Sequence, residues 1–238
     1  MHIYKIAIYI FIFFFISNTS AQNSEESNNK LYVTVNIASS IFEYSPRYKL
    51  GYITPFSERW MYGIQIGYNN YNLTHKHLKE SIWIEDKYRL FEIRPSLYYV
   101  LNPKNKKNTV YLQSDLFYIN QKDIYVNNTQ ELKEKRYINL SSNLYSNYLG
   151  YDKATFLRKK YGVNFNFGML VVLWRDFGYD FNIGLGIRNR NINYTNIVNP
   201  VELNQTNEGG FITPMPLTET GNRMGLNANI DFKLYYKF

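Results

Sequence analysis

The sequence contains no cysteine, and charged residues make up only 19% of its 238 residues. The absence of cysteine excludes disulfides, thiolate metal sites, thiol nucleophiles and the acylated cysteine of a lipoprotein. After position 21, no apolar run approaches the ~20 residues that a membrane-spanning helix needs. The sequence therefore lacks the marks of a disulfide scaffold, a cysteine enzyme and a helical membrane protein.

Aromatic residues are abundant, at 18% of the chain with 24 Tyr and 16 Phe. Strand surfaces favour aromatic side chains, so this composition indicates an all-β protein, and the length suits one sizeable domain. The formal charge of +8 would attract an anionic partner. The basic residues are scattered and accompany no recognition motif, so we expect no nucleic-acid partner.

Residues 1–21 have the pattern of a secretory signal peptide. Lys5 precedes an apolar run, Ile6 to Ile16, that is too short to span a bilayer. Thr19 and Ala21 supply the small residues that signal peptidase requires. Cleavage after Ala21 would leave a polar lead-in at residues 22–30 and one domain at residues 31–238. An N-terminal anchor that stays attached is the alternative.

The C-terminal segment alternates without exception from Met224 to Phe238, with apolar or aromatic residues at even positions and Gly, Asn, Asp, Lys or Tyr at odd ones. Successive side chains of a strand point to opposite faces, so this pattern predicts a strand with one apolar and one polar face. Similar alternation predicts seven more strands, near residues 31–41, 48–56, 60–69, 89–101, 110–121, 161–174 and 179–188. Pro95 weakens the fourth of these because it cannot donate to the ladder.

The connections between these strands alternate in length. Those after the second, fourth and sixth strands are short, whereas residues 74–87, 127–160 and 196–223 form long ones. Short and long connections therefore lie at opposite ends of the sheet. An alternative of ten strands stays open if Tyr137 to Tyr148 pairs within it.

Eight antiparallel strands with short turns at one end, long loops at the other and an exported N-terminus resemble the small outer-membrane β-barrels of Gram-negative bacteria. The resemblance implies an all-β, antiparallel up-and-down transmembrane β-barrel in the outer membrane. It also implies that Leu234, Tyr236 and Phe238 form the C-terminal signal read by the outer-membrane assembly machinery. It brings no catalytic motif and no cofactor.

The size of the side chains on each face of the sheet indicates which face meets lipid. A soluble, lipocalin-like barrel would place the apolar face inside, but that face is too bulky for an eight-stranded interior, which side chains just fill. Its large members are Tyr62, Phe165, Phe167, Tyr179, Phe181 and Phe232, whereas the polar face contains Gly63, Gly67, Gly162, Gly168, Gly184 and Gly186. Trp60, Trp174, Phe177 and Phe238 gather at the short-turn end, as an interfacial aromatic girdle requires.

The polar face carries charges that must be paired or hydrated inside a barrel. They are Glu92, Arg94, Asp115, Arg188, Asp231 and Lys233, three acids and three bases. We expect a salt-bridge network that plugs the lumen. The alternative is a narrow passive pore with a charged lining.

Two further segments could carry chemistry. His75 and His77, with Ser81 or Glu80, could serve a lipid-modifying outer-membrane enzyme, but their spacing matches no motif, so we expect no enzyme and no metal site. The connection at residues 127–160 is basic and rich in tyrosine, and could grip lipopolysaccharide phosphates. Its candidate contacts are Lys133, Lys135, Arg136, Arg158, Lys159 and Lys160. We therefore expect a non-enzymatic barrel with an envelope-structural or surface-interaction role; a merely solvated loop is the alternative for this connection.

Overall fold

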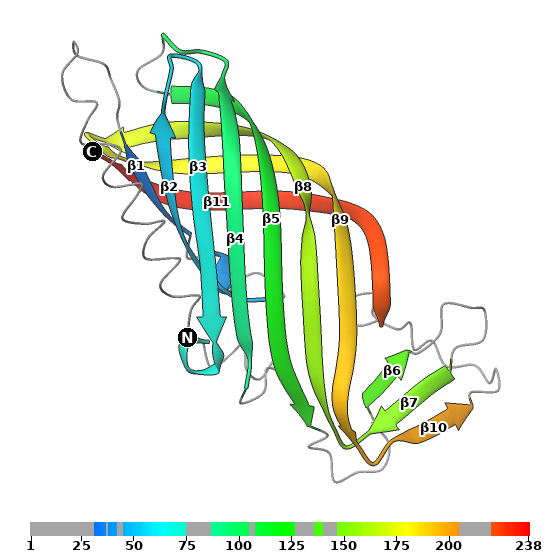
Figure 1. Ribbon diagram of the computed structural model, residues 1–238. Coiled ribbons are helices and arrows are strands. Elements are labelled where there is room, and N and C mark those ends of the chain that lie inside the picture. The colour runs from blue at the N-terminus through cyan, green and yellow to red at the C-terminus, as the bar shows by residue number, and fades with distance from the viewer. Residues whose placement is uncertain are drawn as a thin grey trace, which may run out of the picture.

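The computed structural model describes residues 31–36, 38–41, 45–74, 87–104, 108–126, 136–139, 147–204 and 220–238. Eight strands close into one antiparallel barrel in sequence order, and β1 pairs with β11 to complete the ring (Figure 1). The strands are β1 (Tyr32–Asn36), β2 (Tyr48–Pro55), β3 (Trp60–Asn70), β4 (Arg89–Val100), β5 (Asn108–Val126), β8 (Lys153–Trp174), β9 (Phe177–Val198) and β11 (Gly221–Lys237). The predicted eight-stranded up-and-down barrel is confirmed.

A second, three-stranded sheet lies at the long-connection end, with the order β10-β7-β6. Its strands are β6 (Arg136–Asn139), β7 (Asn147–Tyr151) and β10 (Val201–Asn204). Tyr137 pairs with Gly150 of this sheet and not with a barrel strand. The ten-strand alternative is therefore wrong.

Helical structure in the described residues is limited to two short segments, α2 (Ala38–Ile41) and the 3-10 helix η1 (Tyr71–Leu73). The first predicted strand extended to Ile41, but β1 ends at Asn36, because the Asn36 side chain accepts a hydrogen bond from the Ser39 backbone N–H at 3.0 Å and starts a helical turn. No helix in the described part of the chain has the length and apolar character to cross a membrane.

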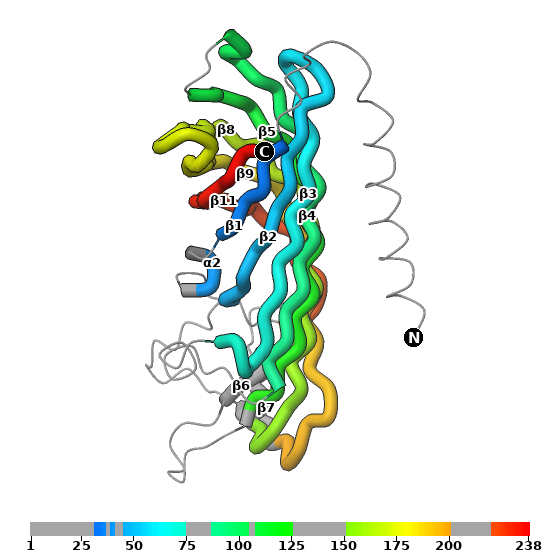
Figure 2. Tube along the Cα trace, turned by 90° about the vertical axis from the view of Figure 1, so that its left-hand side faces the viewer, coloured from blue at the N-terminus to red at the C-terminus, as the bar shows by residue number. Residues whose placement is uncertain are grey.

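The barrel strands differ greatly in length. β8 and β9 each contain 22 residues, whereas β2 contains 8. β5, β8 and β9 extend beyond the other strands and curve toward the small sheet, as Figures 1 and 2 show. Two predicted long connections are correspondingly shorter: β8 already begins at Lys153, and β9 continues to Val198.

Pro95 is accommodated without a change of register. Ile93 faces Tyr118 and Ser96 faces Asp115, and pairing between β4 and β5 is interrupted only at the two residues between them. On its other side, Pro95 lies opposite Ile64 of β3. The missing proline donor therefore interrupts one ladder locally and leaves the strand intact.

The two faces of the barrel wall have the predicted polarity. Phe165 and Leu185 on the outer face are 67% and 68% exposed, whereas Asn164 and Asp180 are fully buried inside. The outer face carries large apolar side chains on successive strands, including Ile64, Ile66, Leu97, Leu112, Leu116, Phe167, Phe181, Ile183, Ile187, Leu226, Ile230 and Phe232. The lipocalin-like alternative, with its apolar interior, is wrong.

This outer apolar band has an aromatic border at each end. At the short-turn end, the Trp60 and Tyr99 rings meet edge to face at 5.0 Å, and those of Tyr236 and Phe238 at 4.8 Å. At the other end the band stops at exposed aromatic residues on four adjacent strands, Tyr68, Phe91, Tyr118 and Tyr161. On β8, residues 153–160 therefore lie beyond the band.

Candidate functional site

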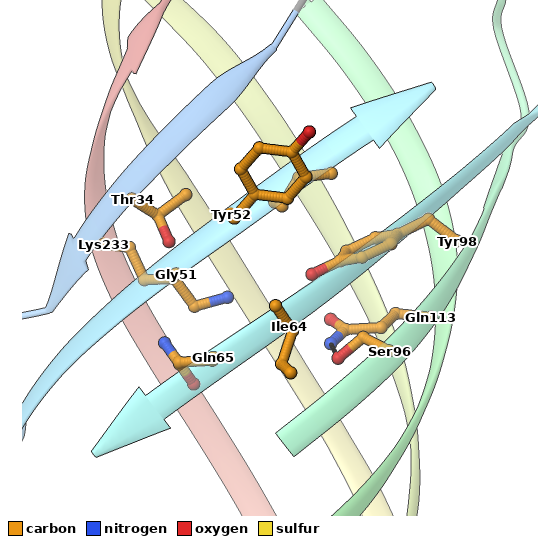
Figure 3. Close-up of a pocket in the computed structure, with 10 residues that line it drawn as sticks. Thr34, Gly51, Tyr52, Ile64, Gln65, Ser96, Tyr98, Gln113 and Lys233 are labelled. Carbon is orange, nitrogen blue, oxygen red and sulfur yellow. Dashed lines mark hydrogen bonds between the residues drawn. The ribbon is translucent and has the colours of Figure 1, made fainter. Parts of the chain in front are cut away.

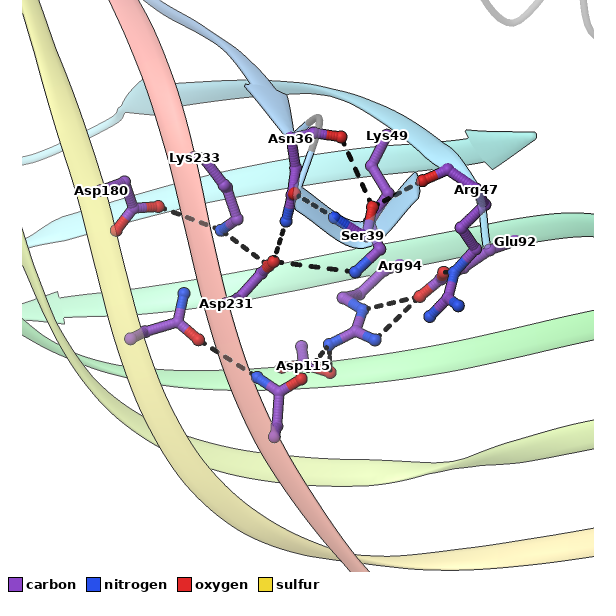
Figure 4. Close-up of polar contacts among 12 residues, drawn as sticks. Asn36, Ser39, Arg47, Lys49, Glu92, Arg94, Asp115, Asp180, Asp231 and Lys233 are labelled. Atoms are coloured by element: carbon purple, nitrogen blue, oxygen red, sulfur yellow. Dashed lines mark hydrogen bonds and ion pairs between the residues drawn. The ribbon is translucent and has the colours of Figure 1, made fainter. Parts of the chain in front are cut away.

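The barrel interior contains a buried network of ion pairs, here called the interior network. Glu92 points inward from β4 and is fully buried. Arg94 donates to its Oε1 from Nε at 3.0 Å and from Nη2 at 2.8 Å, and Arg47 donates Nε to its Oε2 (Figure 4). One carboxylate therefore ties the start of β2 to β4.

Asp231 and Asp180 form the second part of the interior network. Lys233 Nζ lies 3.0 Å from Asp180 Oδ2 and 3.4 Å from Asp231 Oδ2, so this ammonium bridges two carboxylates. Lys49 Nζ approaches Asp231 Oδ1 at 3.7 Å, and the Asn36 amide donates to the same oxygen. The shared carboxylate of Asp231 connects strands β1, β2 and β11.

Asp115 joins the interior network to a ladder of asparagines. Arg94 Nη1 lies 3.5 Å from Asp115 Oδ1, while Asn164 and Asn166 donate to this carboxylate at 2.9 and 2.6 Å. Asn227 and Asn229 in turn donate to these two asparagines at 2.7 and 3.0 Å. These short amides hold β5, β8 and β11 together across the lumen.

The formal charges of the interior network cancel. Its ion pairs join four carboxylates and four cations: Glu92, Asp115, Asp180 and Asp231 with Arg47, Lys49, Arg94 and Lys233. Each of these side chains is buried. Buried charges are tolerated when they are paired and hydrogen-bonded, so the arrangement can seal the lumen.

Aromatic side chains close the interior toward the short turns. Tyr98 and Tyr111 meet edge to face at 5.1 Å and belong, with Tyr235, to a buried apolar cluster. Gly168 makes room for Tyr111, since a Cβ at this position would lie 2.4 Å from the tyrosine ring. Tyr111 also donates its hydroxyl to Asp180, which attaches the apolar cluster to the interior network.

A small polar pocket lies beside the apolar cluster (Figure 3). Both amide atoms of Gln65 and the Oε1 atom of Gln113 line it without a hydrogen-bond partner among the described residues. Thr34, Tyr98 and Lys233 also line it. A pocket with several free polar groups suits an ordered water, which can satisfy two to four of them.

Five of the six predicted interior charges lie in the interior network; Arg188 lies elsewhere, on the extension of the wall. The prediction missed Arg47, Lys49 and Asp180. Lys49 and Asp180 stand on polar faces that the alternation itself defined, so the sequence pattern could have found them. Arg47 precedes β2, and no strand periodicity applies to it.

Three of the predicted lipopolysaccharide contacts are strand residues and not loop residues. Arg158, Lys159 and Lys160 belong to β8, because the barrel wall extends further than the alternation of the outer face suggested. Lys159 is exposed, Arg158 is buried and Lys160 is half-buried. The strand period of two therefore directs only Lys159 outward. Arg136 lies in β6, while Lys133 and Lys135 lie outside the described residues.

Arg158 and Lys160 belong to a group of basic residues on the inner wall, here called the cationic cluster. Its members are Arg158, Lys160, Arg188, Arg190 and Arg223, on β8, β9 and β11. Lys160 faces Arg190, and Arg190 faces Arg223 on the next strand. Burial, together with the neighbouring Arg47 and Arg190, lowers the pKa of Arg158.

The remaining predicted features are the two histidines, the signal peptide and the C-terminal assembly signal. His75 and His77, and the predicted signal peptide, lie outside the described residues. Leu234, Tyr236 and Phe238 are exposed on the outer face, and the Phe238 backbone N–H donates to Leu31 O at 2.8 Å. Within the described ranges, no group of three or more His, Cys, Asp or Glu side chains could hold a metal ion.

No protein-family model and no curated protein matches the chain. A solved structure, a major outer membrane protein from Thermus thermophilus, is similar, with a TM-score of 0.41 and 10% sequence identity over 88% of this chain and 99% of that one. A likeness at this level assigns neither a family nor a function.

Proposed function

We propose that the chain is an outer-membrane β-barrel whose apolar band lies in lipid. The main support for this proposal is the closed ring of exposed Phe, Leu, Ile and Tyr side chains, which has an aromatic border at each end. Water strongly disfavours an apolar surface of this extent, whereas a bilayer solvates it. On β9 the band runs from Phe177 to Ile187, a length of ~33 Å, which at a tilt of ~40° matches a hydrocarbon core of ~25 Å.

The proposed role is structural or adhesive and not enzymatic. The interior network and the apolar cluster fill the lumen, which supports a plugged barrel over a passive pore. In a plugged barrel, the end with the long connections is the part that would carry the function. Lys159 and Lys122 are exposed beyond the apolar band, where their ammonium groups are suited to contact lipopolysaccharide phosphates.

Cell fractionation combined with gel migration tests the membrane assignment. We expect the protein in the outer-membrane fraction, with a change of migration when the sample is boiled, because a closed barrel resists detergent until heated. Recovery from the soluble periplasm without this change would contradict the proposal. In planar bilayers, the purified protein should give no steady single-channel steps, and regular steps would contradict the plugged lumen.

The C-terminal residues support a proposal about assembly. Leu234, Tyr236 and Phe238 share the outer face of the closing strand, where an assembly factor could read them. Deletion of Phe238 should reduce insertion into the outer membrane, whereas removal of Met1 to Lys5 acts earlier, on export. Normal insertion of the truncated protein would contradict this role.

We also propose that the chain has no catalytic activity. Replacement of His75 and His77 by alanine should leave the lipid A composition of the cell unchanged. An altered lipid pattern, with unchanged amounts of folded protein, would favour the lipid-modifying enzyme instead.

A further inference from the structure

Ionic side chains are distributed unequally between the two faces of the barrel wall. The acidic residues of the eight barrel strands are all buried in the interior; they are Glu92, Asp115, Asp123, Asp180 and Asp231. The outer face of the same strands carries only cations, and each of them is exposed. They are Arg89, Lys122, Lys153 and Lys159. Within these eight strands, the outer face therefore has no carboxylate that could neutralise its basic side chains.

Three of the outward cations, Arg89, Lys122 and Lys159, form a compact group, here called the outer basic patch. Arg89 of β4 lies directly opposite Lys122 of β5. Lys122 in turn faces Leu157 of β8, so Lys159 lies diagonally across the strand pair from Lys122. Side chains that are directly opposed have Cβ atoms ~5 Å apart, and diagonal ones ~7–8 Å apart. The patch thus gathers three positive charges on adjacent strands, which Figure 1 shows side by side.

The outer basic patch has no counter-charge among the described residues. No ion pair in this part of the chain includes any of its three members. Its neighbours on the flanking strands are uncharged amides, since Asn70 of β3 faces Arg89 and Asn191 of β9 faces Lys159. Like charges on neighbouring strands repel one another. The basic sector is therefore confined to three strands, and an anion outside the chain would relieve its repulsion.

The outer basic patch stands immediately beyond the aromatic border of the apolar band. On β4, Phe91 lies two residues from Arg89 on the side of the band, and on β8, Tyr161 lies two residues from Lys159; both rings are exposed. Two strand residues cover ~7 Å. The headgroup layer of one leaflet occupies roughly 5–8 Å beyond the hydrocarbon core. In a bilayer spanned by the apolar band, these cations lie at the depth of the lipid headgroups.

We propose that the outer basic patch binds the phosphate groups of an outer-leaflet lipid of the lipid A type. This inference rests on the proposed function, in which the apolar band lies in the outer membrane and the long connections face outward. The Arg89 guanidinium can donate two parallel hydrogen bonds to phosphate oxygens, while Lys122 and Lys159 add compact charges. Asn120, which is exposed opposite Lys159, offers a further amide donor. The adjoining apolar band favours a phosphate carried on a lipid over a free phosphate, because the acyl chains can pack on it.

Native mass spectrometry of the full-length protein in an uncharged detergent tests this site. Diphosphoryl lipid A is added at increasing mole fraction, and the fraction of protein with bound lipid is measured. We expect the unaltered protein to bind it. Combining Arg89→Gln, Lys122→Gln and Lys159→Gln should weaken binding about ten- to a hundredfold, since each exposed ion pair contributes little alone. Unchanged affinity of this triple variant would overturn the proposal.

A control with the same net charge separates the outer basic patch from general electrostatic attraction. Arg59→Gln, Lys104→Gln and Arg175→Gln, combined in one variant, also remove three exposed cations, but at the short-turn end of the barrel. This control should leave the affinity for lipid A unchanged. An equal loss of affinity in both triple variants would exclude the patch as the site. Lys122→Gln alone should weaken binding about two- to fivefold.

Two further probes identify what the patch recognises. Lipid A without its phosphates should bind much more weakly, and equal binding would show that the acyl chains alone are recognised, against the proposal. Inorganic pyrophosphate at the same concentration should not displace lipid A, and displacement would overturn the assignment to a lipid.

The fate of the triple patch variant in the cell separates this proposal from the proposed function. The variant should still enter the outer membrane and change its gel migration on boiling. If it does so and binds lipid A normally, only the outer basic patch is excluded. Recovery of the unaltered protein from the soluble periplasm would instead overturn the membrane barrel itself.

Discussion

The interior network and the cationic cluster line the same barrel but satisfy their charges differently. In the interior network, the Lys233 ammonium lies within 3.4 Å of both the Asp180 and the Asp231 carboxylates. In the cationic cluster, Lys160 has Phe117 as its close contact, and Arg158 retains a free donor. The first region pairs carboxylates with cations, whereas the Lys160 ammonium in the second region contacts an aromatic ring. Charge pairing thus stabilises the first region, whereas opposed basic residues on neighbouring strands characterise the second.

The largest expected effect comes from breaking the interior network. Glu92→Gln would remove the buried carboxylate that Arg47 and Arg94 share, and should lower the free energy of unfolding by about 3–5 kcal/mol. Urea titration in detergent micelles measures it. Glu58→Gln, at an exposed position between β2 and β3, is the control and should change little. A loss below ~1 kcal/mol, as at exposed ion pairs, would show that water already satisfies these charges.

Substitutions at two glycines test whether the barrel interior is filled beside Tyr111 and open beside Gly225. Gly168→Ala should destabilise the barrel by about 1–3 kcal/mol, because the new Cβ overlaps the Tyr111 ring. Gly225→Ala should cost nothing, and can gain about 0.5–1 kcal/mol because alanine loses less backbone entropy in a strand. Equal losses for both variants would contradict the open space at Gly225. The same urea titration compares them.

Removing one charge from the cationic cluster should have a smaller effect of opposite sign. Arg188→Gln should stabilise the barrel by up to ~1 kcal/mol in low-salt buffer, since it removes a like charge that lies diagonally across the strand pair from Lys160. High salt should reduce this gain, because it screens the repulsion. Lys159→Gln, at an exposed position on the outer face, is the control and should change stability little. A destabilised Arg188→Gln variant would mean that Arg188 has a structural partner.

Stability should also depend on pH. Burial, with Arg188, Arg158, Arg47 and Arg94 nearby, lowers the pKa of Lys160 from 10.5 to about 7. The folded state then binds fewer protons than the unfolded state between these values, so this lysine makes stability rise with pH through that window. Lys160→Gln should remove this rise in stability with pH, measured as the urea midpoint from pH 6.5 to 10. Lys159→Gln should retain the rise. Identical pH profiles for both variants would contradict the lowered pKa.

The sequence predicted the fold and about half of the interior chemistry. Strict alternation identified every barrel strand, because an outer face of Phe, Leu and Ile contrasts with an inner face of Gly, Asn and charged residues. The alternation underestimated the length of β8, which begins at Lys153. In the part of β8 before Tyr161, Phe156 and Leu157 are adjacent apolar residues and positions 158–160 are three consecutive basic ones, so the alternation that marks a strand disappears although the strand continues. Arg158 and Lys160 were therefore assigned to a loop.

The sequence by itself determined which residues point inward and which outward, because the strand period of two depends only on local backbone geometry. Only the tertiary structure decided which inward residues meet. Arg47 and Glu92, or Lys160, Arg190 and Arg223, are far apart in the chain, and strand register brings them together. Register depends on the pairing of all eight strands around the closed ring. A neutral network and a cationic cluster thus arise from one repeated pattern.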